Sequence, residues 1–102
     1  MKRHLFWRNT VKAAEVSETL LQQMQHYLTG LISKEDYALL AEEYYSSYGH
    51  VIEGTEFYEI FSDNIPDCCL FYVDEPGNED EKEYNFHKIL EETYDKLKHV
   101  SK

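Results

Sequence analysis

The chain has 102 residues, of which 42% are hydrophobic, so it is long enough for one domain with its own core and too apolar for a disordered acidic tail. Its formal net charge of −10 disfavours binding to nucleic acid or anionic membranes and favours basic protein partners. We expect one helical domain over residues 1–102, with residues 1–9 as a loose N-terminal extension. This extension begins like a signal peptide, but Arg8 interrupts its apolar stretch, so we expect a cytoplasmic protein without a membrane span.

Apolar spacing predicts a first helix over about residues 10–29, with Gly30 as its stop. The second helix is expected to begin after Ser33, a good N-cap, and to end at Gly49. The predicted core face of the first helix comprises Val11, Ala14, Leu21, Met24 and Leu28, and that of the second comprises Tyr37, Leu40, Tyr44 and Tyr48.

Thr55 is the expected N-cap of a third helix, and the last helix is expected over about residues 81–99. Pro66 suits the first turn of a separate short helix over residues 67–73, although the apolar run 68–73 also fits a buried strand. Four helical pieces with short connections predict an all-α fold, a compact four-helix bundle. The inward residues are expected to be Phe57, Ile60 and Phe61, then Phe86, Ile89, Leu90, Tyr94 and Leu97.

The acids concentrate in residues 35–81, a window with fourteen Asp or Glu and no Lys or Arg. Like charges at helical spacing destabilise an isolated helix, by about 0.2–0.5 kcal/mol per pair, so a helix that carries them favours a basic partner over a plain solvated surface. Tyr side chains beside the acids are candidate aromatic anchors. The predicted partner-binding residues are Glu56, Glu59, Asp63, Tyr72, Asp74, Glu75, Glu79, Asp80 and Glu81.

The sequence contains no catalytic motif of a familiar kind, so we expect no catalytic residue, no metal site and no cofactor. Cys68 and Cys69 are adjacent and lie in apolar company, which indicates two reduced thiols and argues against a reactive thiolate. His87 and Glu91 are spaced to share a metal ion on one helix face, but a polar helix face explains them more simply.

Several short motifs resemble one known family. They are Leu28-Thr29-Gly30-Leu31-Ile32-Ser33 with Tyr37, then Leu70-Phe71, Asp74-Glu75-Pro76, and Tyr84-Asn85-Phe86 with Ile89, Leu90 and Leu97. From about Leu20 to the C-terminus the sequence resembles the colicin D immunity protein family, which includes immunity proteins of contact-dependent growth inhibition systems. The chain departs from that family by roughly a dozen extra N-terminal residues and by a shorter segment before Pro76.

The resemblance implies a helical bundle that binds the nuclease domain of a bacterial toxin, commonly a tRNA-cleaving one, and blocks its active site with acids that resemble substrate phosphates. It implicates Asp74 and Glu75, and charge alone extends the set to residues 79–81. We therefore expect a non-enzymatic immunity protein, a monomer or a 1:1 complex with a basic nuclease toxin domain, that does not itself bind nucleic acid. The alternatives are an acidic antitoxin or nucleic-acid mimic for another basic protein, and a small metal-dependent enzyme using His87 and Glu91.

Overall fold

The computed structural model describes residues 11–100, so the expectation for residues 1–9 lies outside the described part. Within residues 11–100 all regular structure is helical, which confirms the predicted all-α four-helix bundle and removes the strand alternative for residues 68–73. The elements in chain order are α2 (Ala13–Leu28), α3 (Lys34–Tyr48), the 3₁₀ helix η1 (Gly49–Ile52), α4 (Glu56–Cys69), the π-helix η2 (Leu70–Asp74) and α5 (Glu79–Lys98).

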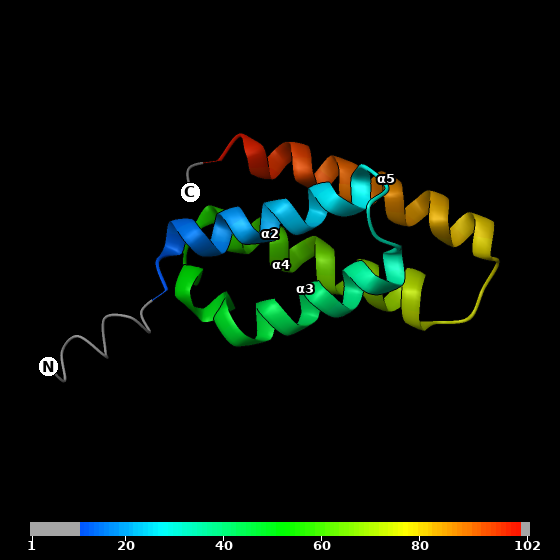
Figure 1. The fold of residues 1–102 in the computed structure, drawn as a ribbon, viewed down its shortest axis with the longest axis horizontal. Coiled ribbons are helices and arrows are strands. Elements are labelled where there is room, and N and C mark those ends of the chain that lie inside the picture. The colour runs from blue at the N-terminus through cyan, green and yellow to red at the C-terminus, as the bar shows by residue number, and fades with distance from the viewer. Residues whose placement is uncertain (1–10, 101–102) are drawn as a thin grey trace, which may run out of the picture.

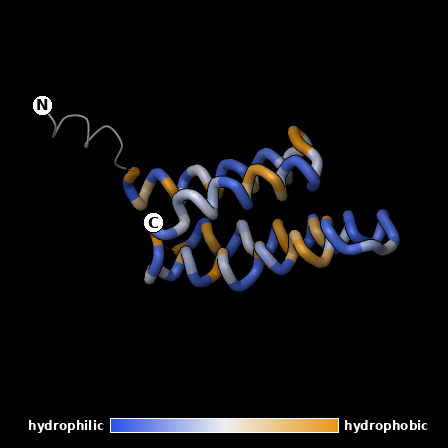
Figure 2. The backbone as a smooth tube through the Cα atoms, turned by 90° about the horizontal axis from the view of Figure 1, so that it is seen from below, coloured by the Kyte–Doolittle hydropathy of each residue, from blue (hydrophilic) through white to orange (hydrophobic). Residues whose placement is uncertain are grey.

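The helices form two layers, one made of α2 and α3 and the other of α4 and α5, as Figure 2 shows. They run roughly along the long axis of an elongated bundle (Figure 1). The layers meet mainly where α2 packs on α5, whereas α3 and α4 do not pack closely along their length. The turn before α5 and the first part of α5 extend beyond the α2–α3 layer.

The helix boundaries follow the predicted local signals. The hydroxyl of Ser33 accepts a hydrogen bond from the backbone N–H of Asp36 at 3.0 Å, and that of Thr55 accepts one from the N–H of Tyr58 at 3.1 Å, so both predicted N-caps are confirmed. Gly30 follows α2 with a φ of 85°, a conformation that glycine adopts readily, which confirms it as the stop.

The core runs the length of the bundle and is rich in large side chains, including Leu20, Met24, Phe57, Phe61, Phe86 and Leu90. The predicted core face of α3 is wrong in part. Tyr37 and Ala41 are buried, whereas Leu40 is 44% exposed and Tyr48 37% exposed. The reason is that α3 rests on α2 and leaves its outer side open, so only a narrow stripe of this helix reaches the core.

The predicted separate helix over residues 67–73 is also wrong. Pro66 lies inside α4, which continues to Cys69 and then widens into the π-helix η2. Proline removes one backbone N–H, so the helix loses a hydrogen bond to residue 62 without ending. None of the helices within residues 11–100 is long and apolar enough to cross a lipid bilayer.

Candidate functional site

The predicted acids of α4 form an exposed ridge. Glu56, Glu59 and Asp63 are all solvent-exposed, and Asp67 continues the same stripe one turn further on. The buried residues of α4 lie on the opposite side of the helix. No cation within residues 11–100 forms an ion pair with these four carboxylates.

The predicted acids around Pro76 lie at the end of the bundle that extends beyond the α2–α3 layer (Figure 1). Asp74, Glu75, Asp80 and Glu81 are exposed there, and no described cation pairs with their side chains. We call these four residues the acidic turn. A cluster of like charges at a projecting end is accessible to a partner over a wide range of approach directions.

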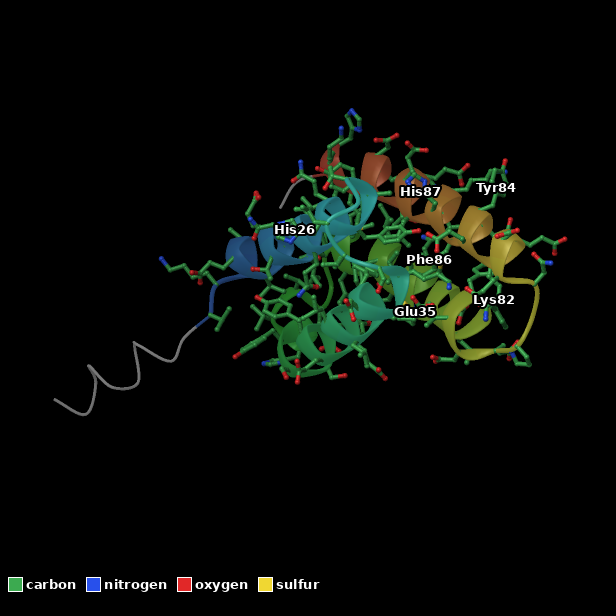
Figure 3. The ribbon with its side chains drawn as sticks, turned by 45° about the vertical axis from the view of Figure 1, so that its right-hand side comes forward. His26, Glu35, Lys82, Tyr84, Phe86 and His87 are labelled. Carbon is green, nitrogen blue, oxygen red and sulfur yellow. The ribbon has the colours of Figure 1, made fainter. Side chains whose placement is uncertain are left out.

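Glu79 differs from its neighbours because it belongs to an internal ion-pair network. Its carboxylate accepts hydrogen bonds from Lys34 Nζ at 2.6 Å and lies 3.4 Å from Lys82 Nζ. Lys34 also donates to Glu35 at 2.7 Å, so one ammonium links α3 to α5. Figure 3 shows Glu35 and Lys82 at this same end of the bundle. Glu79 therefore acts first as a structural residue and is less available to a partner.

The Lys34 side chain is only 2% exposed, which is unusual for a lysine. Its burial lowers the pKa of the ammonium, but hydrogen bonds to Glu35 and Glu79 outweigh that effect and raise the pKa above its ordinary value. The same hydrogen bonds lower the pKa of both carboxyl groups, with Lys82 also acting on Glu79. The network is therefore fully charged near neutral pH.

A groove that the sequence did not predict lies between α3 and the α4–η2 segment. It has a volume of about 570 Å³ and a mostly apolar lining. Two exposed aliphatic side chains stand on its walls, Leu39 at 67% exposure and Leu70 at 44%. We call this the α3–α4 groove, and it is lined by Glu35, Ala38, Leu39, Ala41, Glu42, Tyr45, Ser46, Phe61, Ile65, Pro66, Cys69, Leu70, Val73 and Asp74.

Two polar contacts hold α3 in place at the two ends of this groove. At one end the Tyr45 hydroxyl and the Ser62 hydroxyl share a hydrogen bond of 2.6 Å, and the Tyr45 ring stacks on Phe61 with centroids 5.4 Å apart. At the other end Lys34 bridges to Glu79. Between these anchors α3 and α4 do not pack closely, which leaves the floor of the groove open.

Acidic side chains flank the apolar floor of the groove. Glu42 stands on the α3 wall and Asp74 on the η2 wall, and no Lys or Arg lines the groove. Cys69 also lines the groove. Its burial, together with the negative charges of Asp74 and Glu42, raises the pKa of its thiol to about 12.

Two of the predicted residues lie in a separate hollow. Asp63 and Tyr72 line a smaller hollow of about 220 Å³ between α4 and α5, which also contains Lys96. Tyr72 is half-buried and packs against the core and against Phe71, with ring centroids 6.5 Å apart. The predicted site residues therefore fall into four places: the α4 ridge, the acidic turn, this hollow, and the ion-pair network that contains Glu79. Only Asp74 also belongs to the α3–α4 groove.

The residues considered for chemistry lie on α4 and α5. His87 and Glu91 line a shallow hollow on the outer side of α5 together with Tyr84, and Figure 3 shows Tyr84 and His87 away from the inward-facing Phe86. In this part of the chain no group of three or more His, Cys, Asp or Glu is arranged to hold a metal ion. Burial and the neighbouring Cys69 raise the pKa of the Cys68 thiol to about 12, which opposes a nucleophilic role.

The fold and these surfaces define a class in physical terms: an all-α bundle with exposed carboxylates and an open apolar groove. Comparisons of the chain with protein families, with curated proteins and with solved structures find no match.

Proposed function

We propose that this protein is an immunity protein that binds a basic nuclease domain of a bacterial toxin and covers its active-site cleft. The observation that carries the proposal is the acidic turn. Its four exposed carboxylates have no ion-pair partner within residues 11–100, and they lie at a projecting end of the bundle. The resemblance of residues 74–76 to the acid-Pro segment of colicin D immunity proteins supports the same surface.

The physical basis is substitution of carboxylates for phosphates. A nuclease that binds RNA or DNA presents Lys and Arg side chains to phosphate groups. Exposed carboxylates can accept charge-assisted hydrogen bonds from those same side chains, and Arg can bind them in a bidentate way. Opposite fields also increase the rate of encounter, and this effect weakens as salt rises.

The ion-pair network decides which acids the test should change. Reversal of Glu79 would remove the partner of a buried lysine, so a loss of binding in that variant would not report on the interface alone. The informative variant is D74K/E75K/D80K, which leaves the network intact. Its matched control is E43K/E53K/E91K, which changes the net charge by the same amount at three exposed positions away from the acidic turn.

The experiment uses the full chain and the nuclease encoded directly upstream of its gene. The association rate is measured at several salt concentrations, and RNA cleavage is measured with and without the full chain. We expect the unchanged protein to bind in a 1:1 ratio and to stop cleavage, the acidic-turn variant to associate about tenfold more slowly or worse, and the control to protect. Equal loss in both variants would show that only net charge matters, and protection by the acidic-turn variant would exclude that surface.

An acidic antitoxin or nucleic-acid mimic directed at another basic protein would use the same carboxylates. Binding without inhibition of nuclease activity would favour this alternative.

A further inference from the structure

The α3–α4 groove is a surface distinct from the acidic turn and the α4 ridge, although Asp74 belongs to both the turn and the groove. Its floor includes side chains of the hydrophobic core, namely Ala41, Phe61 and Ile65, which pack beneath an opening of about 570 Å³. Leu39 and Leu70 stand exposed on opposite walls. Apolar floors with exposed aliphatic walls favour an apolar occupant, because contact with it removes both surfaces from water.

The walls of the groove favour a helical occupant. Every described wall residue belongs to a helix, so the backbone groups are already hydrogen-bonded within their own helices. An extended peptide would find no strand edge to pair with and would leave its own backbone groups unsatisfied. A helix satisfies its backbone internally and can lay an apolar stripe along the groove, as helices do in bundles. The small side chains of Ala38 and Ala41 leave room for close approach.

The rim of the groove favours a basic occupant. Glu42 and Asp74 face the opening from opposite walls, and neither has an ion-pair partner within residues 11–100. Glu35 lies on the same rim, although it is paired with Lys34. The complementary helix carries apolar residues at positions i, i+3, i+4 and i+7, flanked on both sides by Lys or Arg.

We propose that the α3–α4 groove binds an amphipathic helix of the protein partner that carries Lys or Arg beside its apolar stripe. The inference rests on the proposed function in naming the partner, and it adds an apolar anchor to an interface otherwise described by charge alone. The helix completes the side of the bundle where α3 and α4 do not pack closely. The two anchors, Tyr45–Ser62 and Lys34–Glu79, keep the groove open before the partner arrives.

The test uses three labelled peptides of about 14 residues, each with the full chain, because a helix of about that length is needed for marginal stability. The first has Leu at the stripe positions and Lys on the flanks. The second has the same composition with the Leu residues dispersed. The third replaces Lys with Glu. Affinity is measured by fluorescence anisotropy, and the contact surface is mapped by amide NMR shifts.

We expect the amphipathic basic peptide to bind at least about tenfold more tightly than the dispersed one, and the acidic peptide to bind more weakly than both. The shifts should map to α3 and α4. Equal binding of the amphipathic and dispersed peptides would overturn the inference, because it would mean that charge alone attracts them.

Two pairs of variants locate the binding. Ala38→Trp fills the groove, and its control Ser47→Trp adds the same side chain at an exposed position outside it. Glu42→Lys reverses a rim charge, and its control Glu43→Lys reverses the neighbouring exposed residue that does not line the groove. We expect a weakening of about tenfold or more for A38W and a larger loss for E42K than for E43K. If A38W fails to fold, as judged by circular dichroism, the E42K and E43K pair decides alone.

The outcomes separate this inference from the proposed function. If the nuclease is neutralised while A38W and E42K bind it with unchanged affinity, the groove is not part of the interface and the inference fails. If the amphipathic peptide binds in the groove but no upstream nuclease is neutralised, the proposed function fails and the groove remains a helix-binding site. A dimer in light scattering that A38W converts to monomer would identify a second copy as the occupant and would also overturn the inference.

Discussion

The substitution Tyr37→Phe is expected to stabilise this protein. Tyr37 is fully buried in the core, and its hydroxyl has no hydrogen-bond partner within residues 11–100. A buried polar group without a partner costs about 1–3 kcal/mol of stability. Burial raises the pKa of this phenol well above its usual range, with smaller contributions from Cys69 and Cys68. The hydroxyl is therefore neutral and still unsatisfied.

The free energy gained by removing the unsatisfied hydroxyl exceeds the free-energy cost of the small cavity that its removal leaves. A hydroxyl occupies roughly the space of one water, about 10–15 Å³, and an empty space of that size costs about 0.2–0.4 kcal/mol. The phenyl ring keeps its edge contact with Phe86, whose centroid lies 6.0 Å away. A net stabilisation of about 1 kcal/mol remains, which raises the melting temperature by about 4–8 °C for a domain of this size.

Tyr27→Phe is the matched control, because the two rings are neighbours with centroids 6.1 Å apart and the chemical change is identical. The Tyr27 hydroxyl donates a hydrogen bond of 2.5 Å to the Glu83 carboxylate. A bond to a charged group contributes about 1.5–3 kcal/mol, and the exposure of Glu83 reduces this to about 1 kcal/mol. Urea unfolding followed by circular dichroism should show midpoints that move in opposite directions. A loss of stability in both variants would refute the reasoning and would show that Tyr37 has a polar partner.

Three further predictions concern pH, thiols and capping. Lys34 lowers the pKa of Glu35 and Glu79 below the ordinary 4.5, so the network stabilises the protein above that pH. This contribution is lost as pH falls through the lowered pKa values. The urea midpoint of the Lys34→Met variant should therefore fall less steeply between about pH 7 and about pH 3 than that of the unchanged protein. The Cys68 thiol, with its pKa raised to about 12, should react with a disulfide reagent at neutral pH at least about tenfold more slowly in the folded protein than in urea. Asn78→Ala should reduce stability by about 1 kcal/mol in the same unfolding assay, because the Asn78 side chain caps α5 at 3.0 Å.

Local signals in the sequence predicted most of the helical architecture. Ser33 and Thr55 cap their helices because a short hydroxyl side chain can reach the free N–H groups of the first turn, and this depends only on residues within the same turn. Gly30 ends α2 for a similarly local reason. The large apolar residues of α5 also fall on the predicted side, because its spacing is regular over 20 residues.

The features that were missed depend on contacts distant in sequence. From the sequence alone, Lys34 is expected to be solvent-exposed. Its burial depends on the ion pair with Glu79, which is 45 residues away in the sequence. The error in the predicted core face of α3 also arises from contacts that are distant in sequence. Leu40 has the right spacing for the core, but no helix covers it, and periodicity carries no information on which faces a neighbour will cover.

The α3–α4 groove also accounts for the weakly amphipathic sequence of α3. A helix that fully buries only Lys34, Tyr37 and Ala41 has little apolar area to fix its position, so hydrophobic packing alone would let it shift toward α4 and close the gap. The hydrogen bond at Tyr45 and the ion pairs at Lys34 are directional, and they fix both ends of α3 at a set spacing. Polar anchors at the ends and an open apolar middle follow naturally if the remaining contacts of α3 are made to a partner.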